Sequence, residues 1–172
     1  MDPMSEKRTA DETLSYLFRR VAVYLGTRAN LFTTLIALRA RADGWLAIET
    51  LGALTQPQTT ARRFDAVVPR GISQGHSPDE ADLEVTFGDE RLALRIRSLP
   101  VDPSRPPNLS PVAHQPPESV LILVSYPVRL DDQIWQDATE TMARTPGITL
   151  LDQVQFQLPG PDRVVVSLWR RG

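Results

Sequence analysis

The chain has 172 residues and a net charge of -2, with 41% hydrophobic and 23% charged residues. This length and composition are typical of one compact globular domain and exclude a disordered or collagen-like chain. The absence of cysteine excludes disulfides, thiolate metal sites and cysteine nucleophiles, and His76 and His114 are the only imidazoles. No stretch is apolar and long enough for a membrane span or a signal peptide, so we expect a cytoplasmic protein without a membrane partner.

Arginine dominates the basic residues: Lys7 is the only lysine among the nineteen. A GC-rich genome produces this bias, and so does selection for forked guanidinium contacts to phosphate or carboxylate. Because the acidic residues number twenty-one, no global positive field attracts nucleic acid. This charge balance is still compatible with a local basic patch as a nucleic-acid-binding surface.

Helical periodicity governs the first 70 residues. Thr9-Ala10-Asp11-Glu12 fits a capping box and is followed by apolar residues at helical spacing as far as Gly26. A second apolar stripe begins near Leu31 and is expected to stop at Asp43-Gly44, where glycine favours a helix end. With a short third segment and a fourth that starts at a proline, the predicted helices cover residues 9–26, 31–44, 45–54 and 57–68.

The pattern changes to strands after residue 80. Residues 82–87 and 90–97 alternate polar and apolar side chains around Gly88-Asp89, which predicts a β-hairpin. Seven prolines between Pro100 and Pro117 predict an exposed, extended loop or linker. The remaining predicted elements are a strand over 120–126 that is buried on both faces, a helix over 131–144, and strands over 149–158 and 163–169.

This order predicts an α+β or α/β fold in which N-terminal helices precede a mixed β-sheet. The buried strand, the helix and the strand that follows it indicate a β-α-β crossover. We expect a helical region over residues 1–72 and a mixed-sheet domain over residues 73–172 that includes the proline-rich segment.

The stretch Pro78 to Ser98 resembles the central hairpin of the PD-(D/E)xK, restriction-endonuclease-like superfamily. The resemblance implies a nuclease-like fold over about residues 60–170. In that superfamily an Asp opens one strand, and a Glu-x-Lys on the next strand helps to hold magnesium and activate water. Here Asp82 or Asp79 stands at the first position, whereas Arg95 and Arg97 stand where the acid and the lysine are expected. Arginine offers only donors and a fixed positive charge, so it cannot ligate magnesium.

The pairing register of the predicted hairpin also bears on these residues. A two-residue loop places Leu83 opposite Leu94 on the core face. It places Asp82 opposite Arg95 on the other face, away from the core. A solvated hairpin face with an Asp82–Arg95 ion pair therefore needs no active site. Three alternatives stay open: this solvated face, an anion-binding face built from Arg91, Arg95 and Arg97, and a divergent metal site built from Asp79, Asp82 and Glu84.

Residues 51–72 are similar to the helix-turn-recognition-helix passage of winged-helix DNA-binding proteins, with the hairpin as a wing. Short polar side chains and cations near the start of a recognition helix contact bases and phosphates. The residues that meet this requirement are Gln58, Thr59, Thr60, Arg62 and Arg63. An ordinary surface helix with adjacent arginines produces the same pattern.

Other candidate sites are weak. Ser119 and Ser125 lack a glycine elbow, and the chain has no phosphate-binding loop. His76 and His114 are expected to lie exposed in loops. Trp135 and Trp169 are expected in the core rather than against bases. We therefore expect no metal, cofactor or catalytic residue.

The leading hypothesis is a non-catalytic DNA-associated protein, a regulatory or accessory subunit of a DNA-processing or defence assembly, whose nuclease-like site is degenerate. The first alternative is a protein-interaction module or homo-oligomer that binds no nucleic acid. The second alternative is a divergent metal-dependent nuclease.

Overall fold

The computed structural model describes residues 3–56, 66–69, 81–87, 89–129 and 131–172. Its helices are α1 (Pro3–Gly26), α2 (Ala29–Leu38), α3 (Asp43–Thr55), α4 (Ser110–Ala113) and α5 (Gln133–Ala143). Its strands are β1 (Ala66–Pro69), β2 (Leu83–Phe87), β3 (Glu90–Pro100), β4 (Val120–Val128), β5 (Ile148–Gln157) and β6 (Arg163–Arg171). The predicted α+β class, with N-terminal helices before a mixed sheet, is confirmed.

The strands form one six-stranded sheet in the order β1-β2-β3-β4-β6-β5. The pairs are antiparallel except β3 and β4, which run parallel. Strands β4 and β5 run in the same direction, but β6 lies between them. The predicted crossover from β4 through α5 to β5 therefore passes over one strand.

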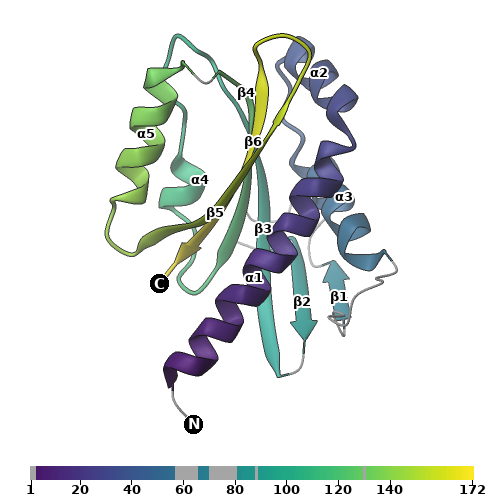
Figure 1. The fold of residues 1–172 in the computed structure, drawn as a ribbon, viewed down its shortest axis with the longest axis vertical. Coiled ribbons are helices and arrows are strands. Elements are labelled where there is room, and N and C mark those ends of the chain that lie inside the picture. The colour runs from purple at the N-terminus through teal and green to yellow at the C-terminus, as the bar shows by residue number, and fades with distance from the viewer. Residues whose placement is uncertain (1–2, 57–65, 70–80, 88, 130) are drawn as a thin grey trace.

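Helices cover both faces of this sheet, with α1, α2 and α3 on one side and α4 and α5 on the other (Figure 1). Strand β4 supplies alternate side chains to the two cores. Ile122 packs with α1 to α3, and Leu121 packs with Trp135 and Trp169 on the opposite face. The prediction that this strand is buried on both faces is confirmed, and so is the core placement of the two tryptophans.

The helix boundaries near residue 40 differ from the prediction. Helix α2 ends at Leu38, and Arg39 takes a left-handed conformation with φ 49°. The main-chain N–H groups of Arg39 and Ala40 donate to carbonyls of the last turn and close the helix. Asp43-Gly44 begins α3 instead of ending α2, because an aspartate suits the start of a helix as well as a glycine suits its end.

Strand β1 corrects the prediction of a helix that reaches Val68. Residues 66–69 pair with β2 in an antiparallel register that places Val67 opposite Val85. Such pairing depends on a strand further along the chain, so a local helical pattern does not reveal it. The first part of the predicted helix, residues 57–65, lies outside the described residues.

The proline-rich segment is packed, not a linker. It carries the short helix α4, and its apolar residues Val101, Leu109 and Val112 are buried in the core of the α5 face. The segment connects the parallel strands β3 and β4, so it must return along the sheet and cover it. Prolines exclude a long helix here, but they do not prevent burial of the apolar residues between them.

Within the described residues no single helix is long and apolar enough to cross a membrane. By length and composition alone, one bent pair, residues 11–26 with α2, passes such a test together at an angle of 74°.

Candidate functional site

The candidate site is built on the hairpin of β2 and β3. Its register places Leu83 opposite Leu94 and Val85 opposite Leu92, as predicted. Leu83, Leu94 and Ile96 point into the core beneath α1 and α3. The N–H of Asp82 donates to the Leu94 carbonyl at 2.9 Å, which carries the pairing one residue past the start of β2. Asp82 therefore opens the strand, and its side chain belongs to the opposite face.

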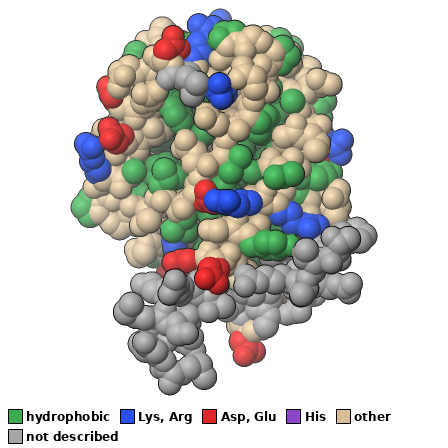
Figure 2. Space-filling model, in the orientation of Figure 1, with side chains coloured by type: hydrophobic (Ala, Val, Ile, Leu, Met, Phe, Trp, Pro, Cys, Tyr) green, Lys and Arg blue, Asp and Glu red, His purple; other side chains and the backbone are tan. Residues whose placement is uncertain are grey.

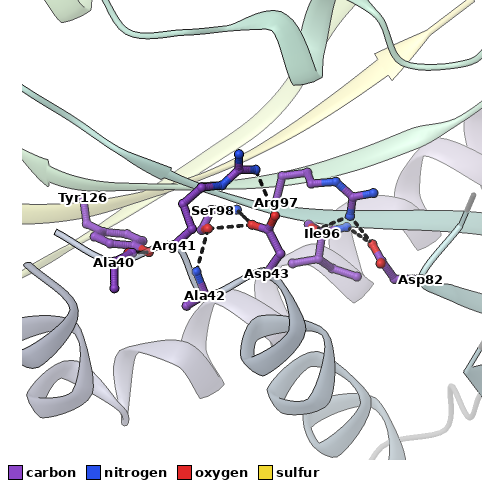
Figure 3. Close-up of polar contacts among 9 residues, drawn as sticks. All are labelled: Ala40, Arg41, Ala42, Asp43, Asp82, Ile96, Arg97, Ser98 and Tyr126. Atoms are coloured by element: carbon purple, nitrogen blue, oxygen red, sulfur yellow. Dashed lines mark hydrogen bonds and ion pairs between the residues drawn. The ribbon is translucent and has the colours of Figure 1, made fainter. Parts of the chain in front are cut away.

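A buried ion pair occupies that face. Arg97 Nη1 lies 2.7 Å from Asp82 Oδ2, and the main-chain N–H of Ile96 donates to the same oxygen at 2.7 Å. Arg97 Nη1 also donates to the Ile96 carbonyl. Figure 3 shows the Asp82 carboxylate turned toward both donors. Two charge-assisted hydrogen bonds on one oxygen hold this carboxylate in a fixed orientation.

The prediction of a solvated hairpin face is wrong. Asp82, Arg95 and Arg97 are only 4%, 4% and 7% exposed. Arg95 pairs in register with Leu121 of β4, and Arg97 with Leu123, both of which belong to the core on this face. The arginine stems consequently lie inside the molecule, because β3 is an inner strand of the sheet and not the outer half of an isolated hairpin.

The site lacks the ligand set of a magnesium centre within the described residues. No group of three or more acidic or histidine side chains comes together there. Glu84 is half-buried on β2, and Asp79 lies outside the described residues. Oδ2 of Asp82, which would be a metal ligand in such a centre, accepts hydrogen bonds from Arg97 and from the Ile96 N–H.

The residues predicted to contact nucleic acid differ in exposure, and some of them lie outside the described residues. Arg91 is exposed on β3, whereas Arg95 and Arg97 are buried on the same strand. The residues proposed for a recognition helix, Gln58, Thr59, Thr60, Arg62 and Arg63, lie outside the described residues, as does His76. Nucleic-acid binding by these residues stays a prediction. His114 is exposed, as expected.

Most described arginines are engaged by carboxylates. The ion pairs are Arg19 with Asp152, Arg28 with Glu49, Arg41 with Asp43, Arg97 with Asp82, Arg105 with Asp102, Arg129 with Asp162, Arg144 with Glu140 and Arg170 with Asp11. On the face seen in Figure 2 the basic side chains are scattered, and several stand beside acidic ones. Arginine in the described part of this chain thus serves largely to pair with carboxylates.

A polar cluster that the sequence pattern did not indicate fastens the α2–α3 connection to the sheet. Asp43 Oδ1 accepts from the N–H of Ser98 at 2.6 Å and from its hydroxyl at 2.5 Å. Ser98 Oγ in turn accepts from the N–H of Ala42 (Figure 3). The hydroxyl of Tyr126 donates to the Ala40 carbonyl at 2.8 Å. The available signal in the sequence was Asp43 itself, because an aspartate is a common first residue of a helix.

Burial raises the pKa of the Tyr126 hydroxyl above its ordinary value, and the neighbouring Ser98 hydroxyl opposes this by lowering the pKa. Tyr126 is fully buried on β4 and keeps its proton at neutral pH. It therefore acts as a donor in a structural hydrogen bond, and it is unsuited to act as a base.

Comparison of the sequence with family models and with curated proteins, and of the fold with solved structures, gives no significant match.

Proposed function

We propose that this chain is a non-catalytic DNA-associated protein, a regulatory or accessory subunit whose nuclease-like position is occupied by an ion pair. The observation that carries the proposal is the double hydrogen bond to Asp82 Oδ2 from Arg97 and from the Ile96 N–H, both at 2.7 Å. A carboxylate held in this way is neutralised and oriented by the protein itself.

The geometry of the hairpin supports the non-catalytic part of the proposal. Asp82 opens β2, and Arg95 and Arg97 lie on the adjacent strand at the positions where the resemblance expects an acid and a lysine. Replacing those groups with guanidinium removes one oxygen ligand and adds positive charge. The added positive charge disfavours a divalent cation at this position, which supports the non-catalytic part of the proposal.

The DNA-associated part rests on the sequence. Gln58, Thr59, Thr60, Arg62 and Arg63 combine short polar side chains with cations at the start of one predicted helix. Arg91 is an exposed cation on the hairpin that would act as the wing. Contacts of this kind bind phosphates and produce an affinity that falls as salt rises.

The test is fluorescence anisotropy with a labelled duplex at two salt concentrations, with and without magnesium or manganese. We expect binding at low salt, weaker binding at high salt, and intact DNA with either metal. Replacing Arg62 and Arg63 with alanine should weaken binding, whereas Arg144→Ala, which breaks an exposed Arg144–Glu140 pair, serves as the matched control. Absence of binding at low salt, or equal affinity for both variants, overturns the DNA assignment.

Cleavage of the duplex would overturn the non-catalytic assignment instead. In that case Asp82→Asn identifies the source: cleavage that this variant abolishes supports a divergent nuclease built around Asp79, Asp82 and Glu84. Cleavage that survives it shows that Asp82 is not the source and excludes the divergent nuclease built around these carboxylates.

A second candidate, a protein-interaction module that binds no nucleic acid, is favoured by a different observation. The described arginines are mostly engaged by carboxylates, while Val23, Leu31 and Leu38 are 69%, 45% and 70% exposed on α1 and α2. Contiguous exposed apolar patches mark contacts between proteins, and these three side chains are the candidates for such a patch. Light scattering after size-exclusion chromatography tests self-association: a stable oligomer dissociated by Leu31→Glu supports this candidate, and a monomer at all concentrations counts against it.

A further inference from the structure

A pocket of about 380 Å³ opens at the carboxyl ends of β3 and β4. These strands are the parallel pair of the sheet, and their last paired residues are Pro100 and Tyr126. Beyond this point the chain leaves β3 toward α4 and leaves β4 toward α5, and both helices lie on the same face of the sheet.

The pocket has an apolar wall and a charged rim. Leu35 and Ile36 of α2, Val101 after β3 and Tyr126 of β4 supply the apolar part. Arg39 and Arg129 are the two cations of the rim. A concave apolar site of this size with a few polar groups at its edge matches the usual form of a small-molecule site.

The two carboxylates of the rim are already engaged. Asp162 pairs with Arg129 at 3.1 Å. Asp102 accepts from the N–H and the hydroxyl of Ser104 at 2.9 and 2.7 Å, and these bonds lower the pKa of its carboxyl. Neither carboxylate needs a cation from a ligand.

Arg39 differs from the other residues of the rim. Within the described residues its guanidinium makes no hydrogen bond or ion pair, although its charge acts on the Asp102 carboxylate, and its side chain is exposed at the pocket. Its guanidinium presents up to five N–H donors in a fixed fork that matches a carboxylate. The rim thus carries one cation whose donors are not taken up by a described carboxylate.

The backbone conformation of Arg39 is also unusual for an arginine. Its φ of 49° lies in the left-handed region, which glycine occupies at helix ends without strain. An arginine there holds a costly conformation, and strained residues cluster at functional sites. This conformation ends α2 and places the Arg39 side chain at the pocket rim.

We propose that this pocket binds a small organic monoanion, with its carboxylate on the Arg39 guanidinium and its apolar body against Leu35, Ile36 and Val101. The proposal concerns a different part of the molecule from the Asp82–Arg97 site and does not depend on the proposed function. It assigns Arg39 as the residue that selects a negative charge.

Titration calorimetry with three probes of matched chain length tests the charge preference. The probes are octanoate, 1-octanol and octylammonium, which carry a negative, a zero and a positive charge. We expect octanoate to bind more tightly than 1-octanol by about tenfold, the size of a charge-assisted hydrogen bond, and octylammonium to bind least. Absence of octanoate binding, or equal affinity for all three probes, overturns the proposal.

Arg39→Gly separates binding from folding. Because glycine accepts the left-handed conformation, this variant should unfold at the same or a higher urea concentration than the parent chain, while its affinity for octanoate falls about tenfold. The matched control is Arg41→Ala, since Arg41 pairs with Asp43 and does not line the pocket. Octanoate affinity that survives in Arg39→Gly, or that is lost equally in Arg41→Ala, also overturns the proposal.

Discussion

The Asp82–Arg97 pair shows how one residue changes role with its surroundings. Taking two charges out of water is costly, and the attraction between them compensates only when good hydrogen bonds accompany it. The Ile96 N–H provides such a bond to the same carboxylate oxygen that Arg97 contacts. The pair therefore fixes the start of β2 against β3, and loss of either partner removes a close charge-assisted contact from the inside of the protein.

We predict that Arg97→Met, which keeps much of the side-chain volume, lowers the free energy of unfolding by about 3–5 kcal/mol, because it removes the guanidinium that lies 2.7 Å from the buried Asp82 carboxylate. The double variant Asp82→Asn, Arg97→Met should recover part of that loss, since it removes the Asp82 charge together with the Arg97 cation, while Arg95 stays buried on the same strand. Urea unfolding followed by circular dichroism measures both values.

The control is Arg144→Ala. Arg144 and Glu140 form an exposed pair on α5, and such pairs contribute about 0–1 kcal/mol. A loss in Arg97→Met no larger than the loss in this control would show that the Asp82–Arg97 pair does not hold the hairpin.

Tyr126 gives a prediction with a defined pH dependence. Its pKa is raised by burial in the folded chain, so the stabilisation is present below the unfolded value of about 10 and is lost as pH rises through the folded pKa. At neutral pH Tyr126→Phe should cost about 1 kcal/mol for the hydrogen bond to Ala40. The difference from the parent chain should shrink above about pH 10, as measured by urea unfolding at several pH values. A constant difference up to high pH would contradict the assignment.

Sequence reasoning predicted the pairing of residues in the hairpin but not their burial. Alternation and the two-residue turn fix which residue faces which, because both are local properties. Burial of Arg95 and Arg97 depends on β4, which follows about twenty residues later and pairs with β3 in parallel. The register of Asp82 was thus within reach of the sequence, whereas its partner Arg97 was not.

At the scale of elements, the joint between α2 and α3 is fastened to the sheet by side chains instead of by an apolar contact alone. Asp43 accepts two hydrogen bonds from Ser98 of β3, and Tyr126 of β4 reaches the Ala40 carbonyl. Phe32 packs edge-on against the rings of Trp45, Tyr126 and Phe156. The angle at which α3 leaves α2 is therefore set by the sheet.

We predict that Asp43→Ala destabilises the chain by about 1–3 kcal/mol, because it leaves the Ser98 N–H without its partner in a partly buried position. Arg41→Ala is the control, since it removes only the exposed pair with Asp43 and should cost less than about 1 kcal/mol. Thermal unfolding of both variants measures the two costs. Equal effects would mean that the salt bridge, and not the Ser98 contact, fastens the joint.

The elements that the sequence predicted well are those with strong local signals. The hairpin, β4, α5, β5 and β6 appear close to their expected bounds because alternation, apolar runs and proline-glycine turns define them. Strand β1 and the burial of the proline-rich segment escaped prediction, since each depends on a partner distant in the sequence. The Asp43-Gly44 pair was misread because its two residues favour opposite ends of a helix.

At the scale of the whole molecule, two cores share one sheet. The larger core lies beneath α1, α2 and α3, and the smaller one lies against α4 and α5. Strand β4 contributes alternate residues to each, so neither core can lose its packing without disturbing the other. The predicted helical region and sheet domain follow each other in the sequence, but they share the larger core. The described helices α1 to α3 pack on the sheet itself.

Such coupling predicts a single cooperative unfolding transition. In a Trp45→Phe background, Trp135 and Trp169 report only on the α5 face, because both tryptophans belong to that core. Adding Phe32→Leu should destabilise the opposite core by about 1–3 kcal/mol, and it should shift the fluorescence midpoint as far as the circular dichroism midpoint in urea. A fluorescence midpoint that stays in place while the circular dichroism midpoint falls would show that the two faces unfold separately. The shared residues of β4 argue against that outcome, since Leu121 and Ile122 are neighbours in the chain and anchor opposite cores.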